Sequence, residues 1–561
     1  MNGLPQEVVD NICSYLDHED LKSVLLLSLK FQYAAEQYSG AFESLCLTTE
    51  SIDRFVETDT GRRFRYLRQL EFRTSLPIPE GIEGPEDATE GGNCFRESQE
   101  ELESIDANYT QQINLLFTAI ETVERQECNK NISGNIHLKL LTPTMELNPT
   151  MWPLQRLFVS WRVHLLMPEI LPEVNSIREL TIESPEQTCY SNEPEPSLRK
   201  LDLRVLLDLS DRLPNLSALC CRIGADELYS NTFSSEGLRF ITQDWIGLRK
   251  DSYSRFVESL EKISLRNLRH ARLDFLYPLS HIQCIDQRLP MPELVNPSLC
   301  DPFSTSLRIF SQQLRTMYLR VIADATLFWP DHGDTPHWPN LEHLHVEFHM
   351  STPSGSWYFN EPTGLSLGGA EVGYRVAEAE MYPPLADTEE DDLLWEDTCE
   401  IDLEEAQNNS FQYRVVPNNA ALVPFLTGFA KAAAHMPRLR TFALWSPLSF
   451  RLDPDDEEYR DFDFESVSNI PKDVLYATKL AWGVVYTGPQ ERGFSDDAER
   501  KSNDQRQMLW RTGSWRPQAG LHELFQKIGE EHAKNRSECF DDNGLRDSLD
   551  FERFRYRYFD V

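Results

Sequence analysis

Several features common in proteins are missing from this sequence, and each absence narrows what the chain can be. No apolar run approaches the roughly twenty residues needed to cross a bilayer. The first residues also lack the basic segment and long apolar core of a cleavable signal. Basic residues are scarce: 54 Lys and Arg stand against 91 Asp and Glu, a formal net charge of −37. Because this charge repels phosphate backbones and anionic lipids, we expect the protein to bind neither nucleic acid nor membrane. The irregularly spaced cysteines fit a reducing compartment, so we expect an intracellular protein, in the cytoplasm or nucleus.

Several common cysteine, cofactor and catalytic motifs are missing as well. The 11 cysteines are spread without regular spacing, and no two have the Cys-x-x-Cys spacing of redox and zinc sites. The sequence contains neither the phosphate-binding loop Gly-x-x-x-x-Gly-Lys-Ser/Thr, nor the dinucleotide fingerprint Gly-x-Gly-x-x-Gly, nor the zinc motif His-Glu-x-x-His. We therefore expect reduced cysteines, no cofactor and no catalytic residue.

One histidine-rich segment, 342–349, raises a metal site as an alternative. Its polar and apolar residues alternate, so a strand here would carry the polar ones on one face. Four of them are potential zinc ligands: His343, His345, Glu347 and His349. A polar strand face explains the same pattern without any metal, and it is the interpretation we prefer.

The first forty residues carry the densest local pattern of the chain. Pro5 and Glu7 suit the first turn of a helix. An apolar stripe follows at helical spacing: Val8, Ile12, Tyr15 and Leu16. Asp17 is placed to cap a second helix and Ser28 a third. Three short helices make too small a core to be stable alone, so their apolar surface packs on the rest of the chain or docks on a partner.

Residues 4–36 resemble an F-box. The resemblance rests on Leu4-Pro5-x-Glu7-Val8-x-x-x-Ile12-x-x-Tyr15-Leu16, Asp20-Leu21-x-x-Val24 and Ser28-x-Lys30-Phe31. In that family these helices bind the S-phase-kinase-associated adaptor of an SCF-type cullin–RING ubiquitin ligase. The resemblance implies an adaptor-binding role for Leu4, Pro5, Ile12, Leu16, Leu21 and Val24. Taken one by one, the same residues are also what the core of a helical bundle would contain.

A short phrase recurs along the rest of the chain: an apolar residue, two variable residues, an apolar residue, a variable residue and an apolar residue. Its copies occupy 67–72, 154–159, 177–182, 198–203, 216–221, 268–273, 314–319, 341–346 and 439–444. Each copy resembles the strand segment of a leucine-rich repeat, although most lack the Asn that follows the strand in that family. Helix-like spacing at 99–125 and 420–435 supplies helices before strand-like segments.

These patterns predict an α/β fold with a small N-terminal three-helix F-box, an irregular leucine-rich-repeat-like solenoid of parallel strands with helices, and a C-terminal cap. We expect the boundaries to be 1–40 for the F-box, 41–65 for a linker, 66–350 for the solenoid, 351–410 for an acidic insertion, 411–446 for a final repeat and 447–561 for the cap. The insertion contains a dense acidic run at 387–405 without a basic residue, which is typical of solvated, disordered chain.

Alternation within the repeated phrase should direct its variable residues onto one open face of the sheet. The outward residues that we consider candidates for binding a protein substrate are Arg156, Phe158, Arg204, Arg272, Tyr318, Arg320, His343, His345 and Trp445. Arg and aromatic side chains are enriched in protein interfaces, but a solvated strand face is the simpler explanation for each of them.

The resemblance implies a substrate-recognition subunit of an SCF-type ligase. Such a chain performs no chemistry, because it binds the adaptor at one end and a protein substrate at the other and so raises their effective concentration. The alternative is a non-ligase leucine-rich-repeat scaffold whose N-terminal helices only cap the solenoid.

Overall fold

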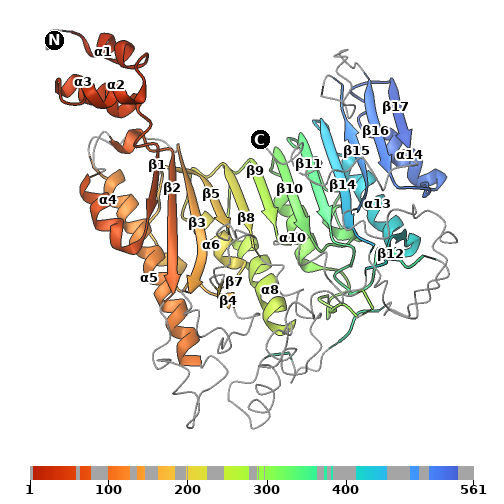
Figure 1. The fold of residues 1–561 in the computed structure, drawn as a ribbon. Helices are drawn as coiled ribbons and strands as arrows, with labels where there is room; N and C mark the ends of the chain where they lie inside the picture. Colours follow the sequence, from red (N-terminus) through yellow and green to blue (C-terminus); the bar gives the residue numbers. More distant parts are fainter. Residues whose placement is uncertain are drawn as a thin grey trace, which may run out of the picture.

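One large β-sheet organises the chain (Figure 1). The computed structural model describes residues 4–58, 63–76, 99–126, 135–145, 162–183, 197–198, 200–223, 246–276, 287–288, 290–295, 297–362, 372–375, 381–382, 412–450, 480–489, 491 and 505–540. In these residues the sheet has 13 strands, and its main path runs in the order β1-β2-β3-β5-β8-β9-β10-β11-β14-β15-β16-β17.

The strands from β1 to β14 on this path are parallel, whereas β15 is antiparallel to both β14 and β16. β17 is parallel to β16, and β6 pairs with β3 at the side. The strands are β1 (Ser44–Leu47), β2 (Gln69–Leu76), β3 (Ile136–Met145), β5 (Ile177–Glu183), β6 (Ser197–Leu198), β8 (Ala218–Arg222), β9 (His270–Asp274), β10 (Thr316–Val321), β11 (His343–Phe348), β14 (Thr441–Leu448), β15 (Leu480–Thr487), β16 (Arg506–Arg511) and β17 (Arg536–Phe540). The predicted α/β class with a mostly parallel sheet is confirmed.

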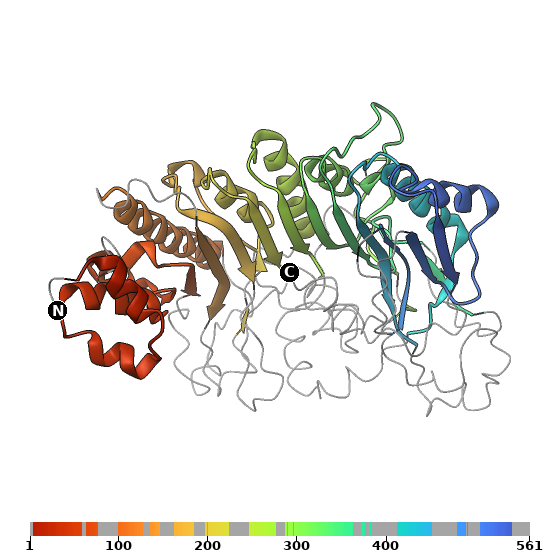
Figure 2. The ribbon, with the colours of Figure 1, turned by 90° about the horizontal axis from the view of Figure 1, so that it is seen from above.

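Helices cover one face of this sheet, and Figure 2 shows them along the outer side of its arc. They are α4 (Ile52–Thr58), α5 (Gln99–Glu124), α6 (Arg204–Asp211), α8 (Ile246–Lys262), α10 (Pro302–Ser311), α13 (Asn419–Ala433) and α14 (Ala519–Lys527), with short 3-10 turns η1 (Thr49–Ser51), η2 (Arg63–Arg65), η6 (Pro168–Ile170) and η8 (Ala325–Leu327). Helices are about 10 Å wide and strands about 4.8 Å apart, so a layer of helices bends the sheet away from itself. Among the described helices, none is long and apolar enough to span a membrane.

Three further helices precede the sheet: α1 (Gln6–Cys13), α2 (His18–Val24) and α3 (Leu29–Tyr38). We call residues 4–39 the N-terminal helical unit. Because α3 leads directly into β1, the unit lies beyond the edge at which the parallel strands begin (Figure 1).

Strand register brings the repeated phrase into continuous rows. The middle apolar position of the phrase forms one row of register partners through Leu70, Leu138, Leu180, Leu219, Ala271, Met317, Leu344 and Phe442. None of these side chains is more than 3% exposed. The row faces the helices and forms the centre of the main hydrophobic core.

Backbone hydrogen bonds at the strand starts hold this register. A carbonyl oxygen just before a strand accepts two successive N–H groups from the next strand. Ser217 O accepts from Arg269 and His270 (2.9 and 3.0 Å), Arg269 O from Arg315 and Thr316 (2.7 and 3.1 Å), Arg315 O from Glu342 and His343 (2.8 and 3.3 Å), and Glu342 O from Arg440 and Thr441 (2.7 and 3.2 Å). The same geometry in consecutive units gives them the same register.

Asparagine has a structural role before the strands, whereas the sequence led us to look for it after them. Asn215 Nδ2 donates to Asn175 O, and Asn267 Nδ2 donates to Pro214 O, each at 2.8 Å. These side chains satisfy carbonyls in the turns that lead into neighbouring strands.

The predicted linker at 41–65 is wrong, because this segment belongs to the sheet and its core. It contains β1, which pairs with β2, and the amphipathic helix α4. Its apolar residues Leu47, Ile52, Phe55 and Phe64 are buried in the main core. A short amphipathic stretch looks like a linker when its partner surface comes from distant sequence.

Two copies of the repeated phrase are not among the parallel strands described above. Copy 198–203 does not form one parallel strand of the large sheet. Leu198 belongs to β6, which pairs antiparallel with β3, whereas β7 (Lys200–Leu201) pairs with β4 (Arg162–Val163) and helix α6 follows. Copy 154–159 lies outside the described residues, as does the acidic run 387–405. The insertion also begins later than expected, because β12 (Phe359–Asn360) pairs with β13 (Val416–Pro417).

The first residue of β12 and the two residues before it are buried in the main core. Trp357, Tyr358 and Phe359 are each no more than 2% exposed. Three consecutive aromatic side chains bury too much apolar surface to belong to a solvated insertion.

The expected C-terminal cap extends the large sheet rather than closing it with a separate layer. β15, β16 and β17 continue the sheet beyond β14. At this end of the sheet, Trp510 of β16 stacks on Phe540 of β17 at 5.7 Å between ring centroids. The Arg516 guanidinium lies 4.6 Å from the centre of the same Phe540 ring.

Gly483 in β15 should be intolerant of any side chain. It is the register partner of Trp445, and an added Cβ would lie 2.5 Å from Trp445 Cβ and 2.6 Å from Leu444 O. We expect Gly483→Ala to lower the free energy of unfolding by about 1–3 kcal/mol, measured by chemical denaturation.

Gly520→Ala is the matched control. Nothing lies within 4 Å of its added Cβ, and the helix should gain about 0.5–1 kcal/mol. An equal effect of the two substitutions would contradict the packing argument.

Candidate functional site

The N-terminal helical unit has its own small core and its predicted caps. Asp17 accepts a hydrogen bond from the Asp20 N–H at 2.9 Å, and Ser28 accepts one from the Phe31 N–H at 3.4 Å, as the sequence predicts. Pro5 stands one residue before α1 instead of inside its first turn. The core is a cluster separate from the main one and consists of Val9, Cys13, Leu21, Phe31, Ala34 and Ala35.

Polar contacts join this unit to the sheet. The buried Glu36 carboxylate pairs with Arg63 at 2.8 Å, and Arg63 also lies 4.7 Å from the centre of the Phe42 ring. The Tyr66 hydroxyl donates to Tyr33 O at 3.5 Å. These contacts fix the unit to the start of the sheet without burying its outer apolar side chains.

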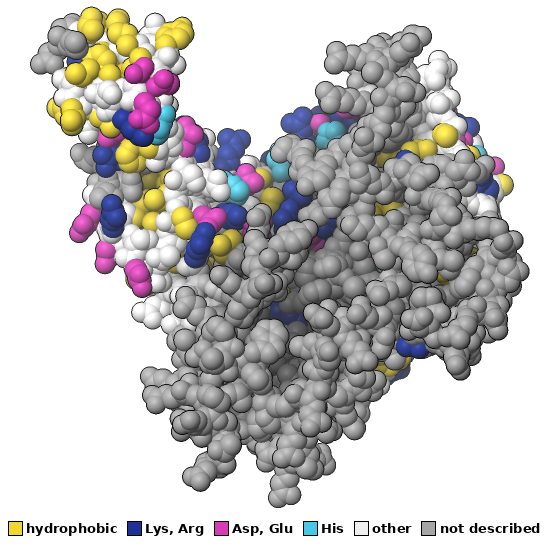
Figure 3. Space-filling view, viewed as in Figure 1, with side chains coloured by type: hydrophobic (Ala, Val, Ile, Leu, Met, Phe, Trp, Pro, Cys, Tyr) yellow, Lys and Arg dark blue, Asp and Glu magenta, His cyan; other side chains and the backbone are white. Residues whose placement is uncertain are grey.

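Large apolar side chains are exposed on the helical unit, and Figure 3 shows them gathered there. We define the exposed apolar surface as Leu4, Val8, Ile12, Tyr15, Leu26, Leu27, Leu29 and Tyr33. Leu26 is 96% and Tyr15 84% exposed. The expected stripe of α1 is thus largely on the outside, because α1 packs on α3 through Val9 and Cys13 instead. Such a concentration of exposed apolar groups is typical of an interaction surface.

The six predicted adaptor-binding residues divide into three groups. Leu4, Pro5 and Ile12 are exposed, and Leu16 and Val24 are half-buried against the small core. Leu21 is 3% exposed and is the one buried residue of α2. Its side chain holds α2 in the unit, so it offers no surface to a partner in this conformation.

The predicted substrate-binding residues do not form one surface. Arg156 and Phe158 lie outside the described residues, and Arg204 is the first residue of helix α6 instead of part of the sheet face. Three are half-buried on the sheet face away from the helices: Arg272, Tyr318 and His343. Three others are less than 9% exposed, contrary to the expected open face: Arg320, His345 and Trp445.

Arg320 is buried because it belongs to a ladder of alternating charge across the sheet. Seven residues on neighbouring strands from β2 to β11 make up this charge ladder: Glu71, Lys139, Glu183, Arg222, Asp274, Arg320 and Glu347. Lys139 lies 3.4 Å from Glu71 and 2.7 Å from Glu183, and Arg320 lies 2.9 Å from Asp274 and 2.5 Å from Glu347. Arg222 lies 3.9 Å from Glu183.

The pKa values of Lys139 and Arg320 reflect these pairs. Burial by itself lowers the pKa of Lys139, but the Glu183 and Glu71 carboxylates outweigh it and raise the pKa above its usual value. The same balance, with Glu347 and Asp274 as partners, raises the pKa of Arg320. Sequence patterns did not reveal the ladder, because its charges become neighbours only through strand register.

The histidine-rich strand β11 shows no metal-site geometry. His343 Nδ1 lies 2.8 Å from Thr441 Oγ1, His349 Nδ1 lies 2.7 Å from Ser351 Oγ, and Glu347 is paired with Arg320. Burial first, and then the neighbouring His343, lower the pKa of His345 to about 3. Among the described residues, no group of three His, Cys, Asp or Glu side chains could hold a metal ion.

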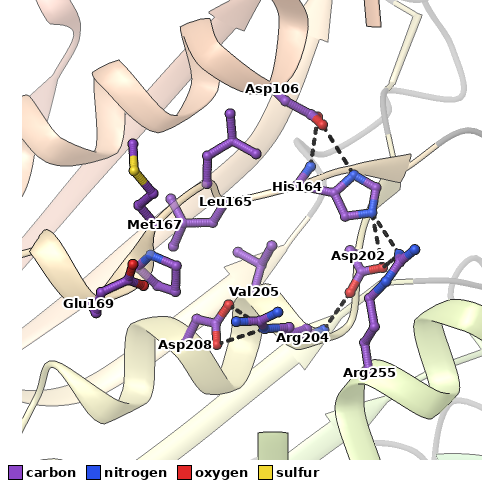
Figure 4. Close-up of a pocket in the computed structure, with 12 residues that line it drawn as sticks. Asp106, His164, Leu165, Met167, Glu169, Asp202, Arg204, Val205, Asp208 and Arg255 are labelled. Carbon is purple, nitrogen blue, oxygen red and sulfur yellow. Dashed lines mark hydrogen bonds and ion pairs between the residues drawn. The ribbon is translucent and has the colours of Figure 1, made fainter. Parts of the chain in front are cut away.

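A cavity of about 450 Å³ lies among α5, α6, α8 and the segment after β4 (Figure 4). No sequence pattern indicated this cavity. Leu165, Leu166, Met167 and Val205 supply its apolar wall. Met167 has a left-handed backbone conformation with φ of 48°, which is unfavourable for a residue with a side chain. The cavity is large enough for a small molecule.

His164 lies between two carboxylates at one side of this cavity (Figure 4). Its Nδ1 is 3.3 Å from Asp106 Oδ2 and its Nε2 is 3.4 Å from Asp202 Oδ2. Arg255 Nη1 also donates to Asp202 Oδ2 at 2.8 Å, and it lies 2.7 Å from His164 Nε2. One carboxylate therefore holds two cationic groups next to each other.

These carboxylates keep His164 charged at neutral pH. Burial lowers its pKa, but hydrogen bonds and charges from Asp106 and Asp202 outweigh burial and raise it to about 9. In turn, His164 and Arg255 keep the pKa of Asp202 below its usual value despite burial. An imidazole that is protonated at neutral pH is a poor general base.

One sequence pattern bears on the expectation that the chain has no catalytic residue. Gly364-Leu365-Ser366-Leu367-Gly368 has the Gly-x-Ser-x-Gly spacing of a nucleophile elbow. That motif requires a strand before the serine and a helix after it. These five residues lie outside the described residues.

Comparison with models of protein families and with curated proteins finds no match to this chain.

Arg320 should matter for stability, because two carboxylates share its guanidinium. We expect Arg320→Met to lower the free energy of unfolding by about 3–5 kcal/mol, since it leaves Asp274 and Glu347 buried without this cation. Chemical denaturation measures this loss. Adding Asp274→Asn and Glu347→Gln should restore much of it, because the buried charges are then removed. No restoration would mean that the loss comes from packing.

His164 should make stability depend on pH. Its pKa of about 9 in the folded chain exceeds the ordinary value of 6.5, so its stabilising effect is complete below pH 6.5 and disappears as the pH rises through 9. We expect His164→Gln to reduce the free energy of unfolding more below pH 6.5 than above pH 9. Denaturant titrations of both proteins at each pH test this. A difference that does not change with pH would contradict the charged His164.

Proposed function

We propose that this chain is the substrate-recognition subunit of an SCF-type cullin–RING ubiquitin ligase, with the N-terminal helical unit as an F-box that binds the S-phase-kinase-associated adaptor. The observation that carries the proposal is the exposed apolar surface of this unit. Leu4, Pro5 and Ile12 are solvent-facing, and they are three of the residues to which the F-box resemblance assigns adaptor contacts. A partner that covers them would remove a large apolar area from water.

The arrangement of the unit argues against the alternative of a scaffold with a helical cap. A cap would bury its apolar side chains against the end of the sheet. Here the contacts between the unit and the sheet include the Glu36–Arg63 ion pair and the Tyr66 hydroxyl, while Val8, Ile12 and Tyr15 face solvent. The small core is separate from the main core.

The remainder of the chain is, in this proposal, an irregular leucine-rich-repeat-like solenoid that binds a protein substrate. Support comes from the parallel strands, the repeated phrase in register and the helices on one face. The half-buried Arg272, Tyr318 and His343 remain candidates for substrate contact.

The proposal predicts that adaptor binding depends on the exposed residues and that stability does not. We expect Leu4→Ala with Pro5→Ala to abolish capture of the full chain by purified adaptor–cullin complex. Because both side chains are exposed, the free energy of unfolding should change by less than about 0.5 kcal/mol. A pull-down and a denaturation curve on the same sample measure the two effects.

Two control variants separate binding from folding. Leu115→Ala removes a comparably exposed leucine on α5 and should leave adaptor binding intact. Leu21→Ala cuts into the small core and should cost about 2–5 kcal/mol. A large stability loss from the Leu4 and Pro5 double variant would favour the capping scaffold, and a folded wild-type chain that does not bind the adaptor would refute the F-box assignment.

A further inference from the structure

The edge at which the strands begin carries arginines in a chain whose formal net charge is −37. Four exposed guanidinium groups there have no carboxylate partner in the described part of the chain, and we call them the arginine edge: Arg68, Arg178, Arg266 and Arg269. Figure 3 shows dark blue side chains along this border of the sheet, together with histidine. The concentration of positive charge is local and contrasts with the charge of the whole chain.

Neutral groups hold these arginines in place. Arg68 Nη1 donates to Arg65 O and Leu67 O at 3.0 and 3.2 Å, and Arg269 Nη1 donates to Arg266 O and Leu268 O at 2.8 and 2.7 Å. Because carbonyl oxygens carry no net charge, the guanidinium groups are positioned but not neutralised.

The other two members are bound in the same way by hydroxyl groups. Arg178 Nε donates to Ser217 Oγ at 3.2 Å, and Arg266 Nε donates to Ser264 Oγ at 3.3 Å. Each guanidinium has five N–H donors, so most of its donors stay available for another acceptor.

The described acidic residues on the same edge do not pair with these four arginines. Glu342 is occupied by Arg315, with bonds of 2.9 and 3.1 Å, and lies 3.5 Å from Arg440. Glu179 lies 3.8 Å from His137. Glu43 precedes β1, at the end of the row.

The pKa of His270, next to Arg269, responds to the nearby arginine charges as well as to burial. Its pKa is lower than usual, first because of burial and second because of the Arg315 charge, with Arg178 acting in the same direction and Glu179 and Glu342 opposing.

We infer that the arginine edge binds an extended acidic segment of a protein partner. Arg68 precedes β2 and Arg269 precedes β9, four strand spacings apart along the sheet, or about 19 Å at about 4.8 Å per strand. An extended peptide of roughly six residues covers this length at about 3.3 Å per residue. Arginine binds carboxylates through paired hydrogen bonds, which gives the match chemical as well as electrostatic specificity.

The rest of the molecule favours a short acidic peptide over a nucleic acid. A nucleic acid would extend beyond the arginine edge, where the strongly negative chain repels its phosphates. A peptide of about the same length as the edge stays within the favourable field.

If the chain has the proposed receptor function, on which this step rests, the acidic segment bound at the arginine edge belongs to the substrate. The N-terminal helical unit lies beyond this same edge of the sheet (Figure 1). A segment bound to the arginines would therefore lie on the side of the sheet from which an adaptor would approach.

The test uses the isolated full-length chain and a fluorescent peptide of repeated Glu-Ser pairs, long enough to span the edge. We expect the anisotropy to show saturable binding that weakens as salt is added. The double variant Arg178→Gln with Arg269→Gln should weaken binding about tenfold, as expected for the loss of two partly exposed charge pairs. A peptide with Gln in place of Glu should not bind.

Two further variants control for the position of the arginine and for loss of charge. Arg536→Gln removes an exposed arginine from β17 at the far end of the sheet and should leave peptide affinity unchanged. Arg178→Lys with Arg269→Lys keeps the charge and should retain much of the binding, which separates loss of charge from misfolding.

Three outcomes would overturn the inference. They are equal affinity of the wild type and the Gln double variant, equal affinity for the Glu and Gln peptides, and displacement of the peptide by a much more tightly bound single-stranded oligonucleotide. Because no adaptor is present, failure here is distinct from failure of the pull-down that tests the proposed receptor function.

Discussion

The hydrogen-bond register of the parallel strands is the constraint on which the other features of the structure depend. A carbonyl oxygen before one strand binds two successive N–H groups of the next, as Arg269 O does with Arg315 and Thr316. Repetition of this geometry places equivalent residues side by side. The apolar core row follows this register, and so does the charge ladder from Glu183 on β5 to Glu347 on β11. The two rows lie on opposite faces of the sheet, and the arginine edge lies where the strands begin.

Charge has different energetic roles in these rows. Within the ladder, Arg320 is less than 9% exposed and is neutralised by Asp274 and Glu347. Burial makes these pairs necessary, because an unpaired charge there would be costly. At the strand starts, Arg178 and Arg269 are exposed, and their bonding partners among the described residues are neutral groups. Solvent makes such charges inexpensive to maintain, which leaves them suited to binding.

The N-terminal helical unit follows a different principle, since its core is too small to bury its apolar side chains. Val9, Cys13 and Leu21 lie inside, while Ile12 and Tyr15 remain in water. The Glu36–Arg63 pair attaches the unit to the sheet through polar groups. A separate core with an exposed apolar surface gives the proposed adaptor-binding unit a place to dock that does not disturb the sheet.

The sequence by itself determined local structure: the caps at Asp17 and Ser28, the long amphipathic helix α5 and most of the parallel strands. These features depend on neighbouring residues, whose spacing is visible in the chain. Which side chains are buried was decided by tertiary structure, because it depends on partners far away in sequence. Val9 replaced Val8 as the core residue of α1 through contact with α3, and Trp445 is buried opposite Gly483. The His164 cluster likewise joins residues from α5, the segment after β4, the turn after β7, and α8, and no local pattern could have indicated it.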